Sequence, residues 1–346
     1  MRNTLPEGSA VHPQEADHAI ALWTTGPGMA ELRHEPQRQA GAGEASVRTM
    51  WTGVSRGTEM IVARGDVPQT EQERMRAPFQ EGDFPFPVKY GYLNVGVVED
   101  GPPQWRGRTV FSLHPHQSRF VASIDALVPV PDAVPARRAV LAGAVETAVN
   151  VIWDARPLIG DRVVVVGAGM IGCSVAALLR GIPGLAVTLV DIDAAKAEIA
   201  QALGARFAAP HDAPPDVDVD ADADVVIEAS GSAAGLGLAL RLAPTDGEVV
   251  VASWYGSGEV PLELGADFHS RRLTIRSSQV GAVAPSRRGR RTTRERLALA
   301  LRLLEDPAFD ALLGGASGWR ELPSVIASLA AGTADEMCHT IDWSAE

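Results

Sequence analysis

The chain has 346 residues, of which 46% are hydrophobic, 21% charged and 5% aromatic, a balance typical of a soluble globular protein. Acidic residues outnumber basic ones by 43 to 31, and the formal charge of -12 argues against nucleic-acid or anionic-membrane partners. Two cysteines exclude a disulfide framework and a four-thiolate zinc site, and no run of 18 apolar residues predicts a membrane span. We therefore expect a cytoplasmic protein with two domains.

The first third of the chain is predicted to form a β domain. Residues 1–18 are polar and predict a flexible tail. From Ala19 to about Pro131, short β-forming runs are separated by Gly and Pro turns without a long amphipathic helix, which favours a small barrel. The segment 64–88 differs, because it carries four prolines and an aromatic cluster. A segment of this length without regular structure is usually functional or disordered.

From Pro135 onward, helices alternate with apolar strands, the pattern of a parallel sheet that is buried on both faces. Six such strands match a doubly wound dinucleotide-binding domain. The predicted strands are 163–167, 186–191, 205–210, 225–230, 248–253 and 273–278, and the predicted helices are 136–153, 170–181, 194–203 and 233–242. The acidic segment 211–224 most simply replaces a helix by a solvated loop. Helices at about 294–305 and 322–331 and a last strand at 337–343 are expected to fold back onto the β domain.

The strongest local motif is the glycine-rich turn 167–172, which follows four valines and opens a helix. Gly167 allows a tight turn, Gly169 lets a pyrophosphate approach the backbone, and Gly172 permits close packing of helix and strand. The helix N-terminus adds free N–H groups and positive potential. We expect this turn, including Met170 and Ile171, to bind a dinucleotide.

Asp191 indicates which dinucleotide is bound. It ends the next strand, 19 residues after Gly172, where a carboxylate accepts hydrogen bonds from both ribose hydroxyls and repels a 2′-phosphate. Asp193 adds a second negative charge, and no arginine or serine follows to accept the phosphate. The predicted cofactor is therefore NAD rather than NADP.

Two further motifs indicate a family. The run from Thr52 to Glu59 and the run from Gly91 to Gly96 resemble zinc-independent members of the medium-chain dehydrogenase/reductase superfamily that carry an S-x-G-T-E motif, such as the bacteriochlorophyllide dehydrogenases. The resemblance implies an α/β fold with a GroES-like β-barrel substrate domain and a doubly wound parallel-sheet Rossmann domain. It places the substrate domain at 19–147, completed by 282–346, and the NAD-binding domain at 148–281. It also implies a homodimer.

The resemblance also shows where the sequence departs from zinc-dependent alcohol dehydrogenases. Ser55 stands at the position of the first catalytic cysteine, Tyr92 at that of the ligand histidine, and Gly143 or a neighbour at that of the third ligand. A catalytic zinc needs three protein ligands and an open position. We therefore predict no metal. His114 and His116 share one face of a strand, but no third ligand is identifiable beside them.

Without zinc, side chains must move the proton and stabilise the developing oxyanion. The resemblance places His114 in the substrate pocket, and the usual pKa of histidine suits proton transfer near neutrality, so it is the first choice as general acid/base. The alternative is a packing histidine at a strand end. Tyr92, with Lys89 lowering its pKa, is a second candidate, although both can instead be structural or solvated. Glu59 is a possible base, or a partner of Arg56 that fixes the loop.

The remaining cofactor contacts come from the family alignment and from the strand ends. Arg56 and His339 match pyrophosphate-contacting positions of the family, and a cation is suited to a diphosphate. The carboxyl ends of the last two strands, where nicotinamide normally lies, add further candidates. They are Ser253, Trp254, Ser278 and Gln279, and Thr147 joins them from the domain junction. The arginine run from 287 to 296 is interpreted as a solvated loop and helix start.

These features predict NAD-dependent oxidation of a secondary alcohol, or the reverse reduction of a ketone, on a polar small molecule of specialised metabolism. One alternative is an NADH-dependent reductase of an activated C=C bond. Another is a non-catalytic protein that senses NADH through domain closure. The loop 64–88 joins two segments assigned to the cleft and is expected to form part of the substrate mouth. Because the sequence does not predict the conformation of this loop, it does not indicate the substrate.

Overall fold

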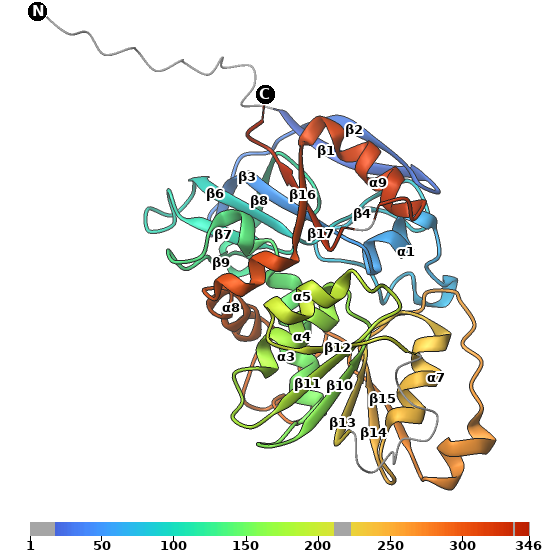
Figure 1. Cartoon of the computed structure of the whole chain (residues 1–346). Coiled ribbons are helices and arrows are strands. Elements are labelled where there is room, and N and C mark those ends of the chain that lie inside the picture. The colour runs from blue at the N-terminus through green and yellow to red at the C-terminus, as the bar shows by residue number, and fades with distance from the viewer. Residues whose placement is uncertain (1–17, 211–222, 335, 346) are drawn as a thin grey trace, which may run out of the picture.

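A computed structural model describes residues 18–210, 223–334 and 336–345. Figure 1 shows two lobes, a β-rich lobe built from both ends of the chain and an α/β lobe built from its middle. The predicted tail therefore lies outside the described residues except for His18, and so does most of the acidic loop 211–224. The combination of a GroES-like barrel domain and a Rossmann domain is confirmed.

The β lobe contains two sheets. The first has the order β2-β1-β5-β4, formed by β1 (His18–Gly26), β2 (Met29–Pro36), β4 (Glu81–Gly82) and β5 (Val88–Lys89). The second has the order β16-β17-β3-β6-β7-β9, with β8 paired to β3. Its strands are β3 (Glu44–Ser55), β6 (Asn94–Asp100), β7 (Thr109–Ser112), β8 (Arg119–Ser123), β9 (Val128–Pro129), β16 (Leu313–Gly318) and β17 (Cys338–Asp342).

The strand β3 connects the outside of this lobe to its interior. Burial alternates along its first half, as expected for a sheet with one covered face, and becomes continuous over Thr52–Ser55. A register shift between Thr49 and Trp51 separates the two halves. The end of β3 is thus covered on both faces, and it leads directly into the short helix α1 (Thr58–Arg64).

The Rossmann lobe has one six-stranded parallel sheet with the order β12-β11-β10-β13-β14-β15. This is the doubly wound order in which the strand sequence reverses beside the first strand, and a ligand crevice forms at the reversal. The strands are β10 (Arg162–Val166), β11 (Ala186–Val190), β12 (Arg206–Ala208), β13 (Val225–Glu228), β14 (Glu248–Val251) and β15 (Thr274–Ser277). All six predicted strands are present.

The helices that follow α1 pack in three clusters. Ala176 of α4 (Met170–Leu179) and Leu301 of α8 (Thr293–Leu303) lie in the same buried cluster as Val145 of α3 (Ala142–Ala155) and Val165 of β10, and α2 (Ala136–Ala139) and α5 (Lys196–Ala202) join them. The helix α7 (Ala233–Leu242) packs with Val164 and Val166 of β10 in a second cluster, and α9 (Leu322–Ala330) packs in the β lobe. No helix within the described ranges is long and apolar enough to cross a membrane.

The structure differs from the predicted elements in several places. The predicted helix 136–153 is divided into α2 and α3, and α8 packs on α3 rather than only on the β lobe. The strands β2 and β16 were not predicted, because β2 is largely exposed and charged and β16 is rich in glycine. The segment 64–88 contains β4 and the start of β5 and is therefore not without structure.

Candidate functional site

The glycine turn after β10 has a geometry that only glycine allows. Gly167 has a φ of 103°, and a Cβ there would lie 2.5 Å from the backbone nitrogen of Ser230. At Gly172 a Cβ would lie 1.9 Å from the carbonyl oxygen of Gly167. A Cβ on Gly169 would meet nothing within 4 Å, so the backbone faces open space at this point. Two glycines thus build the turn, and the third leaves room for a ligand at the start of α4.

The carboxylate of Asp191 lies beside this turn. It accepts hydrogen bonds from the backbone N–H groups of Ala168, at 2.6 Å, and Asp193, at 3.0 Å. The side chain is half-buried at the end of β11. Glycine turn and carboxylate therefore meet as the motif predicts, and the donor set fits the pyrophosphate and ribose of a dinucleotide. Met170 and Ile171 form the first turn of α4, with Met170 largely buried.

The predicted contacts at the ends of β14 and β15 divide into two kinds. Ser253 accepts a hydrogen bond from the N–H of Gly231 at 2.9 Å, and the hydroxyl of Ser278 donates to Asp154 at 2.7 Å, so both side chains are engaged within the lobe. Gln279 is exposed. Trp254 packs against a cluster of the β lobe that includes Val62 and Phe84. The loop after β14 thus reaches across the cleft.

The three remaining cofactor candidates lie in different surroundings. Arg56 is exposed on the turn between β3 and α1. The hydroxyl of Thr147 donates to the carbonyl of Gly143 within α3, at 2.9 Å. His339 is buried, bonded to Glu336 and, at 2.9 Å, to Ser317, and it lines a pocket of ≈ 190 Å³ against α9.

His114 is packed between two aromatic rings. It stacks on Phe120 at a centroid distance of 3.9 Å, and Phe79 lies 5.1 Å away on the loop 64–88. Its Nδ1 lies 3.1 Å from the carbonyl oxygen of Pro115, so the ring proton is on Nδ1. Burial lowers the pKa of His114 to about 3, which keeps the ring neutral. The expectation that its pKa suits proton transfer near neutrality is therefore wrong.

Lys89 is buried and bonded to three side chains, and it is therefore not the solvated lysine that the sequence left open. Its side chain is 1% exposed, and its Nζ lies 2.8 Å from Glu35, 2.5 Å from Glu81 and 3.0 Å from Gln117. These contacts tie β4, at the end of the loop 64–88, to β2. The predicted lowering of the pKa of Tyr92 by Lys89 is wrong, because burial and the charge of Glu59 raise that pKa.

Tyr92 lies at the base of the cleft with hydroxyl groups around it. Its phenol is next to the side chains of Ser55 and Thr58, which belong to the end of β3 and the start of α1 and partly oppose the rise of its pKa. The raised pKa keeps the phenol protonated at neutral pH, and it is therefore a hydrogen-bond donor there. Ser55 and Tyr92, which the predicted resemblance places at two zinc-ligand positions, thus lie next to each other.

Glu59 pairs with His116 rather than with Arg56 as the sequence suggested. Its Oε1 lies 2.6 Å from Nε2 of His116, and its Oε2 accepts from the backbone N–H of Ser55 at 2.8 Å. Both side chains of the pair are buried, with 1% exposure for His116 and 6% for Glu59. From the sequence, His116 was considered only as a possible metal ligand. Its pairing with Glu59 could not be predicted, because the two residues lie 57 positions apart.

The pair of His116 and Glu59 belongs to a longer series of hydrogen bonds. The indole N–H of Trp343 can only donate, so the hydroxyl oxygen of Thr52 accepts from it at 2.9 Å. The same hydroxyl lies 2.8 Å from Nδ1 of His116, whose Nε2 faces the carboxylate of Glu59. This chain of four side chains fixes the carboxylate behind Tyr92.

The donor set at the predicted zinc positions does not fit a catalytic zinc. Ser55 and Tyr92 offer neutral hydroxyl groups, whereas zinc prefers thiolate, imidazole and carboxylate ligands. Both nitrogens of His116 and both oxygens of Glu59 already have partners. Within the part of the chain that the structure describes, no group of three His, Cys, Asp or Glu side chains is arranged to hold a metal ion.

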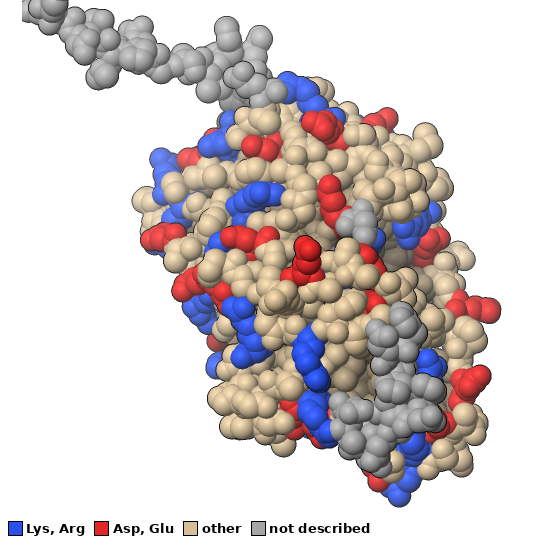
Figure 2. All heavy atoms as spheres, in the orientation of Figure 1, with Lys and Arg blue, Asp and Glu red and all other residues tan. Residues whose placement is uncertain are grey.

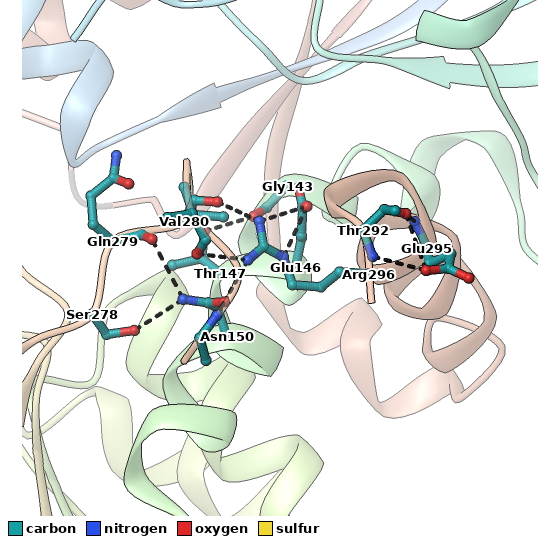
Figure 3. A network of polar contacts seen from close by, with 12 residues as sticks. Gly143, Glu146, Thr147, Asn150, Ser278, Gln279, Val280, Thr292, Glu295 and Arg296 are labelled. Atoms are coloured by element: carbon teal, nitrogen blue, oxygen red, sulfur yellow. Dashed lines mark hydrogen bonds and ion pairs between the residues drawn. The ribbon is translucent and has the colours of Figure 1, made fainter. Parts of the chain in front are cut away.

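A second buried network, shown in Figure 3, lies where α3, α8 and the loop after β15 meet. Arg296 is 1% exposed and forms an ion pair with Glu146 at 3.1 Å. Burial raises the pKa of Glu146 to about 7 although the guanidinium opposes the rise. Arg296 thus departs from the predicted solvated arginine run, whose members 287–294 are exposed. The burial of Arg296 could have been predicted from the helical spacing of α8, because Arg296 lies on the same face as the apolar residues Leu297, Ala300 and Leu301.

Charge on the surface is mixed. Figure 2 shows acidic and basic side chains interspersed over the visible face of both lobes.

Residues 162–302 match the family model described as zinc-binding dehydrogenase. No curated protein matches the sequence. Among solved structures, the chain is similar to L-idonate 5-dehydrogenase from Escherichia coli, with a TM-score of 0.76 and 14% identity over 94% of this chain and 98% of that one.

Two further solved structures contain a cofactor. Acetophenone reductase from Geotrichum candidum, in complex with NAD, has a TM-score of 0.73 and 17% identity over 94% of this chain and 97% of that one. A zinc-binding dehydrogenase from Sinorhizobium meliloti, bound to NADP, has a TM-score of 0.73 and 19% identity over 94% and 99%. At these identities the likeness establishes the fold that the chain shares with them.

Proposed function

We propose that the protein is an NAD-dependent oxidoreductase that transfers hydride between the cofactor and a secondary alcohol or ketone without a catalytic zinc. The observation that carries this proposal is the glycine turn 167–172 with Asp191 beside it, at the point where the strand order of the parallel sheet reverses. The family match of residues 162–302 and the fold shared with dehydrogenases support the reaction class. The substrate is a polar small molecule of specialised metabolism.

The Rossmann lobe, together with Arg56 of the β lobe, would hold the cofactor in two parts. The N–H groups at the start of α4 and Arg56 would bind the pyrophosphate, and Asp191 would accept both ribose hydroxyls and so favour NAD over NADP. The ends of β14 and β15, with Trp254 and Gln279, would border the nicotinamide. When bound, the cofactor supplies the hydride acceptor or donor.

The β lobe would handle the proton. The protonated phenol of Tyr92 would donate a hydrogen bond to the substrate oxygen and stabilise negative charge as it develops there. Ser55 and Thr58 lie beside the phenol, and the backbone N–H of Ser55 donates to Glu59. Glu59, held by His116, would be the final acceptor of the proton during alcohol oxidation and its source during ketone reduction.

His114 and Lys89 keep supporting roles in this proposal. His114 would line the substrate pocket as a neutral ring, and Lys89 would hold the loop 64–88 through Glu81. The loop would cover the mouth of the pocket, because Phe79 contacts His114 and the carbonyl of Asp66 accepts from the N–H of Ser257 across the cleft, at 2.9 Å. We further propose a cytoplasmic homodimer without a nucleic-acid or membrane partner.

Deuteride transfer tests the reaction class directly. NADH labelled at C4 would be incubated with the protein and a panel of polar ketones and α,β-unsaturated carbonyl compounds. Label on a carbinol carbon supports the proposal, whereas label on the carbon beta to a carbonyl replaces it by C=C reduction. Saturable NADH binding without transfer to either class identifies a non-catalytic sensor.

Zinc independence needs a separate measurement. The purified protein is expected to contain substoichiometric zinc, and a chelator is expected to leave hydride transfer unchanged. Stoichiometric zinc whose removal abolishes transfer would overturn the assignment of Ser55 and Tyr92.

A further inference from the structure

The loop that follows β15 is held in place mainly by side chains of two helices. Ladder pairing ends at Ser277, with one further backbone bond from the N–H of Ser278 to the carbonyl of Val251 at 2.8 Å, and the next regular element is α8, which begins at Thr293. Between them, the residues 278–284 contact α3 and α8 through a buried polar network (Figure 3). The position of this loop therefore depends on that network more than on the sheet.

Arg296 is the centre of the network. Its guanidinium donates to the carboxylate of Glu146, to the side chain of Asn150 and to the carbonyl oxygens of Val280 and Ala282, the last at 3.2 Å. A guanidinium is planar and carries five donors in a fixed arrangement, which suits four acceptors on two separate segments. Lysine has a single point charge and does not reproduce this arrangement.

The helix α3 holds both ends of the same loop. Asn150 accepts from the N–H of Ala284 at 3.0 Å and donates to the carbonyl of Gln279 at 3.5 Å. Asp154, one turn further along α3, accepts from the hydroxyl of Ser278 at 2.7 Å. The loop is thus fixed at its first residues, in its middle and at its end.

The fixed loop lies where the nicotinamide half of a dinucleotide is expected. It starts at the carboxyl end of β15, on the edge of the sheet where ligands bind in doubly wound folds. Gln279 is exposed, and Figure 3 shows its side chain turned away from the network. The network therefore holds the backbone of the loop and leaves the polar side chain of Gln279 available.

We propose that Arg296 is a positioning residue that holds the loop 278–284 so that Gln279 and the loop backbone meet the nicotinamide half of the cofactor. The proposal rests on the proposed function, because it assumes that a nicotinamide dinucleotide binds in the crevice. The stability of the fold does not require the buried ion pair of Arg296 and Glu146. Replacing a buried ion pair by apolar side chains of similar size is often neutral or stabilising.

The test separates position from stability with a double variant. Glu146→Leu combined with Arg296→Met removes both buried charges together, so that neither is left unpaired. The dissociation constants of NADH and of ADP-ribose, which lacks nicotinamide, would be measured by titration together with the thermal midpoint. Because the acceptors on Asn150, Val280 and Ala282 lose their donor, we expect a lower thermal midpoint in a protein that still folds. NADH affinity should be lowered about tenfold, which corresponds to the loss of about 1.4 kcal/mol, and ADP-ribose affinity should be unchanged.

Two further variants complete the experiment. Arg290→Met removes an exposed arginine of the preceding loop and should leave all three quantities at their wild-type values. Arg296→Lys keeps the buried charge beside Glu146. It provides the test if the double variant does not fold. We expect it to raise the dissociation constant of NADH severalfold.

The outcomes are distinguishable. A folded double variant, or a folded lysine variant, with wild-type NADH affinity would overturn the positioning role. Equal loss of NADH and ADP-ribose affinity would also overturn it, because it would indicate general damage to the lobe. A wild-type protein that binds neither ligand would overturn the proposed function instead.

Discussion

The two sides of the cleft are built in different ways. On the Rossmann side, the site is a contiguous turn of six residues with one carboxylate from the next strand. On the β side, Thr52, Glu59, His116 and Trp343 come from four segments, and their hydrogen bonds join residues 57, 64 and 291 positions apart. The first arrangement is specified by local backbone geometry. The second exists only after the lobe has folded.

The largest effect is expected from the turn itself. Gly172→Ala places a Cβ at 1.9 Å from the carbonyl oxygen of Gly167, so the start of α4 must shift. We expect NADH affinity to fall by about two orders of magnitude, with a lower thermal midpoint, because the N–H groups no longer converge on the pyrophosphate.

Two other glycines provide the matched comparison. Gly169→Ala fills open space and should lower NADH affinity while leaving the thermal midpoint unchanged. Gly237→Ala lies in α7, where the nearest heavy atom to the new Cβ is 3.8 Å away, and should bind NADH normally. Normal binding by the Gly172 variant would show that the turn does not hold the cofactor.

The next largest effect is expected on the β side of the cleft, where kcat should fall while the dissociation constant of NADH stays constant. Tyr92→Phe removes only the phenolic hydroxyl that contacts Ser55 and Thr58. Since a positioned acid or base contributes about 10²- to 10⁴-fold, we expect kcat to fall by this amount while the dissociation constant of NADH stays constant. Glu59→Gln should have a similar effect on kcat. Steady-state kinetics with near-normal kcat for both variants would remove this network from the mechanism.

Asp191 offers a smaller effect on the Rossmann side. Asp191→Ser removes the carboxylate that opposes a 2′-phosphate, a discrimination on the order of 1 to 3 kcal/mol. The ratio of NADPH to NADH dissociation constants should therefore fall by about five- to 150-fold. Equal affinity of the wild type for both cofactors would contradict the assignment before any variant is made.

The same contrast explains what the sequence could predict. The six strands of the doubly wound domain and the glycine turn with Asp191 beside it follow from short-range patterns, so the sequence could predict them. The partners of Glu59 could not be predicted, because a carboxylate near an arginine in sequence gives no sign of a histidine that is brought in by another strand.

Burial had the same consequence for three other residues. Lys89 and Arg296 belong to residue types that are usually exposed, and only the folded structure shows the carboxylates that let them be buried. From the sequence alone, His114 is expected to have the usual pKa of histidine, but in the structure it is buried beside Phe79 and Phe120 and its pKa is lowered. The residue type alone therefore did not indicate the protonation state.

The smallest effect is expected at His114. His114→Phe keeps an aromatic ring against Phe120 and removes two nitrogens, of which Nδ1 bonds only a neighbouring carbonyl in the structure. Because the ring is neutral down to a pKa of about 3, it does not control activity near neutral pH. We expect kcat to change by less than about threefold, which is far below the contribution of a general acid or base.

The pH dependence of stability should nevertheless differ between the wild type and this variant. The folded pKa of His114 is lowered from 6.5, so its stabilising contribution is present above pH 6.5 and is lost as the pH falls toward 3, where the unfolded chain binds the extra proton. The wild type should lose this part of its free energy of unfolding on acidification, and the phenylalanine variant should not. A large loss of kcat in the variant, with a pH profile that loses a group titrating near neutrality, would instead make His114 the acid or base in place of Tyr92 and Glu59.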